Sequence, residues 1–151
     1  MKRRICLLAH NVRSLWNVGS FFRTADGMGV ERIYLTGYTG IPPRKEISKT
    51  SLGADEWLPW EHREDPAALL QELRADGWSI AALEQLPGSI SLMDYAVPAK
   101  VCLIVGNELT GVSGDLLELG DSVIEIPMLG KKESLNVAVA AGIALHRLRT
   151  A

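Results

Sequence analysis

Short apolar runs recur along this chain, and segments with helical periodicity lie between them. Runs of apolar and β-branched residues predict five strands, at residues 5–9, 32–37, 78–83, 101–106 and 123–128. Helical patterns predict four helices, at residues 17–29, 66–76, 114–119 and 134–149. Because strands and helices alternate, the chain is expected to have an α/β fold, with a mostly parallel sheet covered by helices on both faces.

The size and composition of the chain are those of a folded globular protein. Its 151 residues are expected to form a single domain, residues 1–151, that buries about 70% of its unfolded surface. Cys6 and Cys102 lie in apolar runs, where a buried strand residue is the expected role, and no metal-site spacing occurs. The first apolar run is too short for a signal peptide or a membrane span, so we expect a cytoplasmic protein with no membrane partner.

Charged residues are unevenly distributed along the chain. Residues 1–50 contain nine Lys or Arg and three Asp or Glu, residues 51–130 contain three and fourteen, and residues 131–151 contain four and one. The net charge of −2 argues mildly against a nucleic-acid partner, but the basic groups concentrate at the two ends. If folding brings the ends together, one face is positive and suits phosphate groups. An unevenly charged, solvated surface explains the same counts equally well.

The segment "HNVRSLWNVGSFFRTADGMGV", residues 10–30, follows the first predicted strand. Asn17 is predicted to cap the helix at its N-terminus, and the glycines around Met28 are predicted to end it. Arg23 lies between apolar neighbours and is not explained by the fold. Its guanidinium either extends from a half-buried helix to solvent or is presented to a pocket as a permanent cation.

A glycine-flanked turn follows the fourth predicted strand, in "LIVGNELTGVS", residues 103–113. Ligands of open parallel sheets bind at the carboxyl ends of the strands, so this turn is well placed for binding. It matches neither a Walker loop nor a G-x-G-x-x-G loop. The carboxylate of Glu108 repels phosphate, so the turn suits a ligand with hydroxyls, amines or a cation.

The last segment, "IPMLGKKESLNVAVAAGIALHRL", spans residues 126–148. Ser134 is predicted to cap the final helix, which is apolar nearly all round and therefore buried by the domain or by a second subunit. Asn136 is a poor helix former in an apolar first turn, so its amide is expected to have a partner. Residues 37–57 are predicted to form a long irregular loop, whose Arg44, Lys45 and Lys49 either contact phosphates or are simply solvated.

Taken in order, three of these segments resemble the SPOUT superfamily of RNA methyltransferases, in its SpoU or TrmH-like branch, which methylates ribose 2′-hydroxyls. The matching motifs are residues 17–30, 104–113 and 126–145, and they span most of the chain. A small departure is Ala138, where the family often has Ser. The resemblance implies a C-terminal deep trefoil knot, a homodimer and S-adenosylmethionine as cofactor, with no separate RNA-binding domain in this chain.

The resemblance also implies roles for individual residues. Arg23 would be the central catalytic residue, and the residues that shape the pocket around it would be Asn17, Glu108, Ser134 and Asn136. The residues expected to bind S-adenosylmethionine are Leu83, Glu84, Val105, Gly106, Asn107, Gly111, Ile126, Met128, Leu129, Ser134 and Leu135. The residues expected to contact RNA, with tRNA favoured over rRNA, are Arg13, Arg44, Lys45 and Lys49. No metal is expected.

Two other functions are compatible with the same segments. One is a noncatalytic RNA-binding protein of this fold, against which Arg23, Glu108 and the "SLN" triplet argue. The other is a base-methylating enzyme of another SPOUT branch, which the pairing of Asn17 with Arg23 disfavours. A methyl-transfer assay distinguishes the binding protein from a methyltransferase. Identification of the methylated nucleoside distinguishes methylation of a base from methylation of a ribose.

Overall fold

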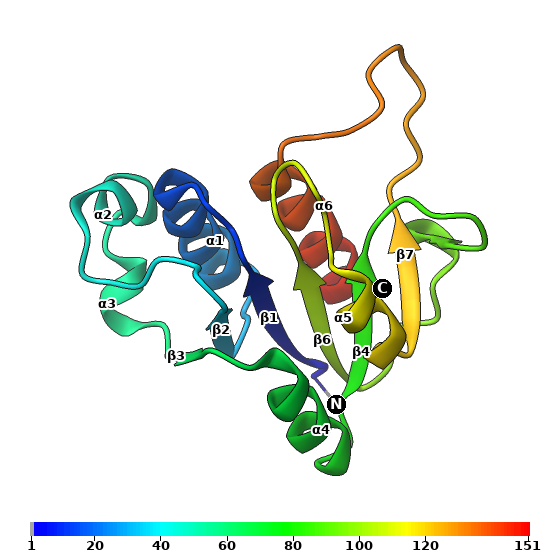
Figure 1. Ribbon diagram of the computed structural model, residues 1–151, viewed down its shortest axis with the longest axis horizontal. Coiled ribbons are helices and arrows are strands. Elements are labelled where there is room, and N and C mark those ends of the chain that lie inside the picture. Colours follow the sequence, from blue (N-terminus) through cyan, green and yellow to red (C-terminus); the bar gives the residue numbers. More distant parts are fainter. Residues whose placement is uncertain (1) are drawn as a thin grey trace.

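A computed structural model describes residues 2–151, and it confirms the α/β fold. One seven-stranded sheet has the order β3-β2-β1-β6-β4-β7-β5 (Figure 1). Every pair of neighbouring strands in it is parallel. The strands are β1 (Arg4–His10), β2 (Arg32–Thr36), β3 (Trp60–Arg63), β4 (Ser79–Leu83), β5 (Ile90–Ser91), β6 (Lys100–Val105) and β7 (Ser122–Glu125). The predicted strands all exist, whereas the short edge strands β3 and β5 were not predicted.

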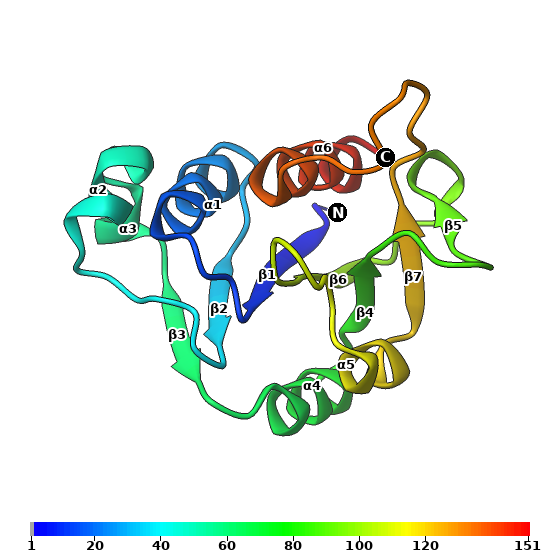
Figure 2. The ribbon, with the colours of Figure 1, turned by 45° about the horizontal axis from the view of Figure 1, so that its top comes forward.

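Helices cover both faces of the sheet. They are α1 (Leu15–Gly27), α2 (Lys45–Ser51), α3 (Ala54–Trp57), α4 (Pro66–Ala75), α5 (Gly114–Leu119) and α6 (Val137–Thr150), with a 3₁₀ turn at Leu92–Asp94. Figure 2 shows α1 and α6 over one face and α4 and α5 over the other. The predicted three-layer arrangement is therefore present.

Two hydrophobic cores lie on the two faces, and β1 contributes to both. Ile5 and Leu7 point into the core under α1 and α6, while Cys6 and Leu8 point into the core under α4 and α5. Successive side chains of a strand alternate between its faces, so a central strand with both faces covered must be apolar throughout. The buried, unpaired thiols of Cys6 and Cys102 are strand residues, as predicted.

The predicted N-terminal caps of α1 and α6 are wrong. The α1 cap is Ser14, whose side chain accepts a hydrogen bond from the main-chain N of Asn17, so Asn17 lies inside the first turn. The α6 cap is Asn136 rather than Ser134, because Asn136 Oδ1 accepts from the main-chain N of Ala138 and Val139. Asn is among the best capping residues, so its poor helix propensity marks the boundary of α6.

The prediction of a wholly irregular segment at 37–57 is also wrong, since α2 and α3 form within it. Ile47 of α2 and Ala54 of α3 are buried, and α2 packs tightly on α1. A Cβ at Gly19 of α1 would overlap Thr50 Oγ1 and the carbonyl oxygen of Ile47. Burial against α1, which local propensity does not reveal, therefore stabilises these short helices.

The two chain ends meet, which was the condition stated for a shared basic face. Arg149 Nη1 donates to the carbonyl of Arg3 at 2.6 Å and its Nε to the carbonyl of Met28 at 2.8 Å, while Arg3 Nη1 donates to Leu148 at 3.0 Å. These two guanidiniums bind main-chain carbonyls, so their role is to join the ends of the fold.

Candidate functional site

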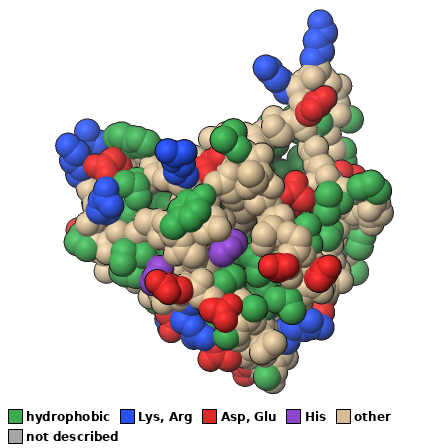
Figure 3. All heavy atoms as spheres, viewed as in Figure 1, with side chains coloured by type: hydrophobic (Ala, Val, Ile, Leu, Met, Phe, Trp, Pro, Cys, Tyr) green, Lys and Arg blue, Asp and Glu red, His purple; other side chains and the backbone are tan. Residues whose placement is uncertain are grey.

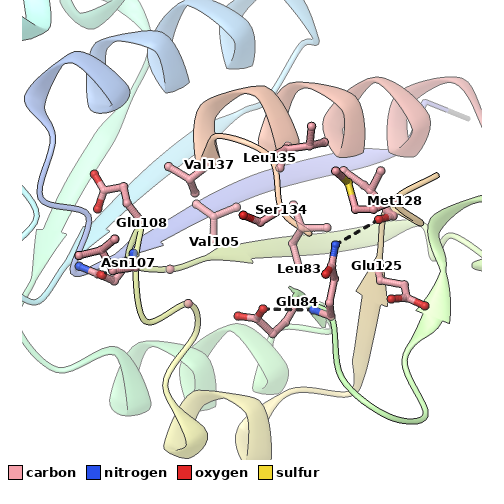
Figure 4. A pocket seen from close by; sticks show the side chains of 16 residues that line it. Leu83, Glu84, Val105, Asn107, Glu108, Glu125, Met128, Ser134, Leu135 and Val137 are labelled. Atoms are coloured by element: carbon pink, nitrogen blue, oxygen red, sulfur yellow. Dashed lines mark hydrogen bonds between the residues drawn. The ribbon is translucent and has the colours of Figure 1, made fainter. Parts of the chain in front are cut away.

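A cavity of about 200 Å³ lies over the carboxyl ends of β6, β4 and β7. Its walls come from the loops that leave these three strands and from the segment that enters α6 (Figure 4). This is where open parallel sheets bind ligands, because the loops after neighbouring strands converge at one edge. The residues that line the cavity are Leu83, Glu84, Gln85, Val105, Gly106, Asn107, Glu108, Leu109, Gly111, Glu125, Ile126, Met128, Ser134, Leu135, Val137 and Ala140.

All residues predicted to bind the cofactor line this cavity except Leu129. Leu129 is 96% exposed, on the loop that projects from the end of β7 in Figure 1. Leu109, within the matching motif 104–113, also lines the cavity, as do Gln85, Glu125, Val137 and Ala140, which were not predicted. Gln85 and Glu125 are chain neighbours of the predicted Glu84 and Ile126. Val137 follows Asn136, and Ala140 lies about one helical turn further on, so widening each motif would have found them.

The projecting loop offers unpaired polar groups to a ligand. In the structure of residues 2–151, the main-chain groups of residues 127–135 make no hydrogen bond to the rest of the chain. The nearest such bond is a long one of 3.5 Å, from Gln85 Nε2 to the carbonyl of Ile126. The two ends of the loop, at Met128 and at Ser134 and Leu135, line the cavity and therefore have free main-chain donors and acceptors beside it.

The turn after β6 is closed and tightly held. Asn107 and Gly111 exchange two main-chain hydrogen bonds, and Asn107 Oδ1 accepts from the main-chain N of Leu109 and Thr110. A Cβ at Gly106 would overlap the carbonyl of Gly111, so glycine is required there. The side chain of Asn107 shapes the turn, and its hydrogen-bonding groups are used within the protein.

Glu108 joins this turn to the N-terminus of α1. Its carboxylate accepts hydrogen bonds from the main-chain N of Arg13 at 3.0 Å, the main-chain N of Ser14 at 2.8 Å and Asn17 Nδ2 at 3.1 Å. Burial by itself raises the pKa of Glu108, but these hydrogen bonds hold that pKa below its usual value. The ionised carboxylate also interacts favourably with the helix dipole. Its immediate partners are thus protein donors.

Asn17 in turn contacts Asn136, which supplies the partner that the sequence required. Asn136 Nδ2 donates to Asn17 Oδ1 at 3.4 Å, while Asn136 Oδ1 caps α6. Glu108, Asn17 and Asn136 therefore form one chain of hydrogen bonds that links the three sequence segments. This series of hydrogen bonds runs beside the cavity, because Glu108 also lines the cavity. Ser134, two residues before Asn136, lines the cavity as well.

The chain matches the model of the SpoU rRNA methylase family over residues 4–146. The chain belongs to this family. It is 33% identical over 146 residues to a tRNA (guanosine(18)-2′-O)-methyltransferase of Aquifex aeolicus, covering 96% of this chain and 68% of that protein. It is also 33% identical to a 23S rRNA (guanosine(2553)-2′-O)-methyltransferase of Bacillus subtilis, covering 97% of this chain and 58% of that protein.

The fold agrees with solved structures as well. The structure of an AdoMet-bound rRNA methyltransferase from Sinorhizobium meliloti superposes with a TM-score of 0.91 at 29% identity. That match covers 99% of this SpoU-family chain and 57% of the other. The chain thus spans little more than half the length of some of the proteins that it matches.

Arg23 of this SpoU-family chain is not brought together with the other predicted catalytic residues. It lies six residues after Asn17 on α1, which places it about 9 Å further along the helix axis and about 120° around it. Its side chain is exposed, and within residues 2–151 it makes no hydrogen bond or ion pair. Arg23 therefore does not line the cavity of its own chain.

The four basic residues predicted to bind RNA are all exposed. Figure 3 shows Lys and Arg side chains gathered over α2, where Lys45 and Lys49 lie, next to Arg44. Lys49 Nζ lies 5.6 Å from the centroid of the Trp16 ring. Arg13 lies apart from them, in the connection between β1 and α1.

No helix among residues 2–151 is long and apolar enough to cross a membrane. The same part of the chain has no group of three or more His, Cys, Asp or Glu side chains that could hold a metal ion.

Proposed function

We propose that this chain is an S-adenosylmethionine-dependent RNA methyltransferase that acts on a ribose 2′-hydroxyl. The observation that carries the proposal is the hydrogen-bonded chain of Glu108, Asn17 and Asn136 at the rim of a cavity over β6, β4 and β7. Relatives named as 2′-O-methyltransferases and the AdoMet-bound structure from S. meliloti support it.

The cavity has the chemistry that the cofactor needs. Neutral adenine requires hydrogen bonds in an apolar slot. Leu83 and Val105 supply the apolar surface, and the unpaired main-chain groups of Met128, Ser134 and Leu135 supply donors and acceptors. The carboxylate of Glu125 makes no hydrogen bond or ion pair within residues 2–151 and suits a cationic sulfonium. When bound, S-adenosylmethionine supplies an activated methyl group. Figure 4 shows Glu125 and Met128 at one end of the cavity and Asn107 and Glu108 at the other.

The protein must position the 2′-oxygen and assist the loss of its proton. We assign Arg23 to this task, since a guanidinium binds phosphate in a bidentate manner and stabilises a developing alkoxide. Asn17, Glu108 and Asn136 hold the segments that shape the pocket, and Ser134 presents its hydroxyl to the cavity.

We further infer a homodimer, in which Arg23 serves the cavity of the partner subunit. Between α1 and α6 lies a groove whose apolar rim includes Val139 and Ile143, which are 52% and 42% exposed. A second copy covering this groove would bury them. Because Arg23 does not line the cavity of its own subunit, a site shared between subunits would bring its guanidinium to the bound RNA.

Replacement of Arg23 by Ala tests the assignment. We expect a loss of about 2.7–4 kcal/mol of transition-state stabilisation, or about 10²–10³ in kcat, with cofactor binding retained. Arg32→Ala is the matched control, because Arg32 is exposed at the opposite, amino end of β2. Normal turnover by Arg23→Ala would exclude this role.

Mixed dimers test the shared site. Two single variants are prepared: Arg23→Ala, and Ala140→Leu, whose leucine fills the cavity of its own subunit. The two variant chains are then co-refolded in equal amounts. A site built from both subunits restores about a quarter of wild-type activity, since half of the dimers are mixed and each has one complete site. A site built within one subunit leaves every mixture inactive.

We favour tRNA over rRNA as the substrate and place the protein in the cytoplasm, where both RNAs occur. Family membership also supports a deep trefoil knot in the C-terminal part of the chain. The decisive experiment incubates the protein with labelled S-adenosylmethionine and separate tRNA and rRNA pools, and then identifies the methylated nucleoside by mass spectrometry. Label in a base, or in neither pool, would contradict the proposed reaction.

A further inference from the structure

A second hollow lies next to the cavity, on the other side of the turn after β6. Its volume is about 410 Å³. It is lined by Arg13, Tyr38, Asn107, Glu108, Leu109 and Thr110. Arg13 and Tyr38 follow β1 and β2, whereas the cavity lies over β6, β4 and β7. Asn107, Glu108 and Leu109 line both spaces, so one turn of the chain separates them.

Tyr38 is held in one orientation while its ring stays accessible. Its hydroxyl accepts a hydrogen bond from Asn107 Nδ2 at 2.8 Å, and its main-chain N donates to Asn11 Oδ1 at 3.0 Å. Asn107 Nδ2 also donates to the carbonyl of Asn11. The residue before it, Gly37, has φ of +62°, and a Cβ there would overlap Asn11. Yet Tyr38 is 61% exposed, so this network fixes the ring without covering it.

The other walls of the hollow have complementary chemistry. Leu109 is 91% exposed and adds an apolar surface. The exposed guanidinium of Arg13 makes no hydrogen bond or ion pair within residues 2–151. The nearby carboxylate of Glu108 already accepts three hydrogen bonds from protein donors. A fixed aromatic ring, an apolar side chain and a free cation are the groups that bind an unstacked nucleotide, through its base and its phosphate.

We propose that this hollow binds the base of the nucleotide whose ribose is methylated. The base stacks on Tyr38, Arg13 contacts a phosphate of the same strand, and the ribose lies at the 106–111 turn, facing the cofactor cavity. The proposal rests on the proposed function, because it assumes an RNA substrate. It assigns Tyr38 as a substrate-binding residue and explains why an aromatic ring is exposed beside the reaction site.

Two variants of Tyr38 separate stacking from structural support. Tyr38→Ala removes the ring, while Tyr38→Phe keeps the ring and removes only the hydrogen bond to Asn107. We expect Tyr38→Ala to lower kcat/KM for RNA roughly tenfold to a hundredfold, on the scale of one lost base stack, and Tyr38→Phe to lose much less. Calorimetry with S-adenosylmethionine should give the same affinity for both variants and the wild type. Equal losses in both variants would make the ring a structural element and overturn the proposal, as would full activity of Tyr38→Ala.

An RNA without the target base tests which base is bound. The wild type first maps its own methylated nucleotide, and the same RNA is then prepared with an abasic ribose at that position. On this RNA, Tyr38→Ala and the wild type should have the same kcat/KM, because the stacking partner is absent. If the difference between them persists there, and disappears only when a neighbouring position is abasic, Tyr38 binds another base and the proposal is wrong.

A binding readout keeps the proposal testable without turnover. A single-stranded RNA with one 2-aminopurine should lose fluorescence on binding to the wild type and to Tyr38→Phe, but not to Tyr38→Ala. Absence of methylation by the wild type would contradict the proposed function alone. Absence of a difference in quenching between the wild type and Tyr38→Ala would contradict the stacking site alone.

Discussion

Replacing Glu108 should destabilise the whole fold as well as the site. Its carboxylate accepts three hydrogen bonds, two of them from the main chain at the start of α1. A hydrogen bond to a charged group contributes about 1.5–3 kcal/mol when it is well shielded. Glu108 is only half-buried, and water replaces part of what is lost, so we expect Glu108→Ala to cost about 2–3 kcal/mol in all.

Glu108→Gln tests how much the negative charge of Glu108 contributes to stability. It retains one acceptor oxygen but loses the negative charge at the N-terminus of α1, so its cost should be about 1–2 kcal/mol. For a chain of this size, 1 kcal/mol corresponds to about 2–4 °C in Tm. Differential scanning calorimetry at neutral pH should therefore give a fall of about 4–12 °C for Glu108→Ala and about 2–8 °C for Glu108→Gln.

The pH dependence gives a second, independent check. Because the folded pKa of Glu108 is depressed, its stabilisation is complete above the pKa of an unfolded Glu, about 4.3, and is lost as the pH falls through the lower folded pKa. The difference in Tm between the wild type and Glu108→Gln should therefore narrow in acid. Glu118→Gln is the control, since Glu118 is exposed on α5 and has no ion pair within residues 2–151. If Glu108→Gln and Glu118→Gln melt alike at every pH, the hydrogen-bonding argument fails.

Two further predictions concern the helices. Asn136→Ala should lower the free energy of unfolding by about 0.5–2 kcal/mol, because the α6 cap is lost. Asn136→Asp should keep the cap and lose only the hydrogen bond donated to Asn17, so equal stability of the two variants in urea unfolding would contradict the capping role. Gly19→Ala should lower the free energy of unfolding by about 1–3 kcal/mol or more, because α1 and α2 must separate to admit the methyl group. Gly27→Ala has open space around it and should be neutral or stabilising, so equal urea midpoints for the two variants would show that the α1–α2 packing is not tight.

The sequence allowed the sheet and most of the cavity to be predicted, because strands buried on both faces are apolar throughout. β1, β4 and β6 each have such a run. β2 and β7 are less completely buried and carry shorter apolar segments, which were still sufficient to predict them. β3 was missed because its polar sequence "WEHR" lies at the sheet edge and carries no such signal. The short helices α2 and α3 were missed because they depend on packing against α1, a tertiary contact that for α2 includes Gly19.

The site residues were predicted more reliably than their arrangement. Glu108, which the resemblance selected, lines the cavity, and Asn17 contacts it. Two of the partners of Glu108 are main-chain amides, which no sequence pattern identifies. Asn136 was recognised as needing a partner, and the structure gives it both Asn17 and the α6 terminus. The position of Arg23 relative to Asn17 follows from helical geometry, since both residues lie on α1.

Because every pair of neighbouring strands is parallel, all strands begin at one edge of the sheet and end at the other. We expect the loops at these two edges to tolerate substitutions differently. The loops at the carboxyl edge carry the cavity and the Tyr38 hollow, and alterations there should affect ligands. The loops at the amino edge, such as Asp76–Trp78 before β4 and Gly120–Asp121 before β7, only return the chain to the sheet. That edge is therefore where a fluorescent label or a point of surface attachment should be introduced, at exposed positions such as Ala99 before β6, which leaves the carboxyl edge free.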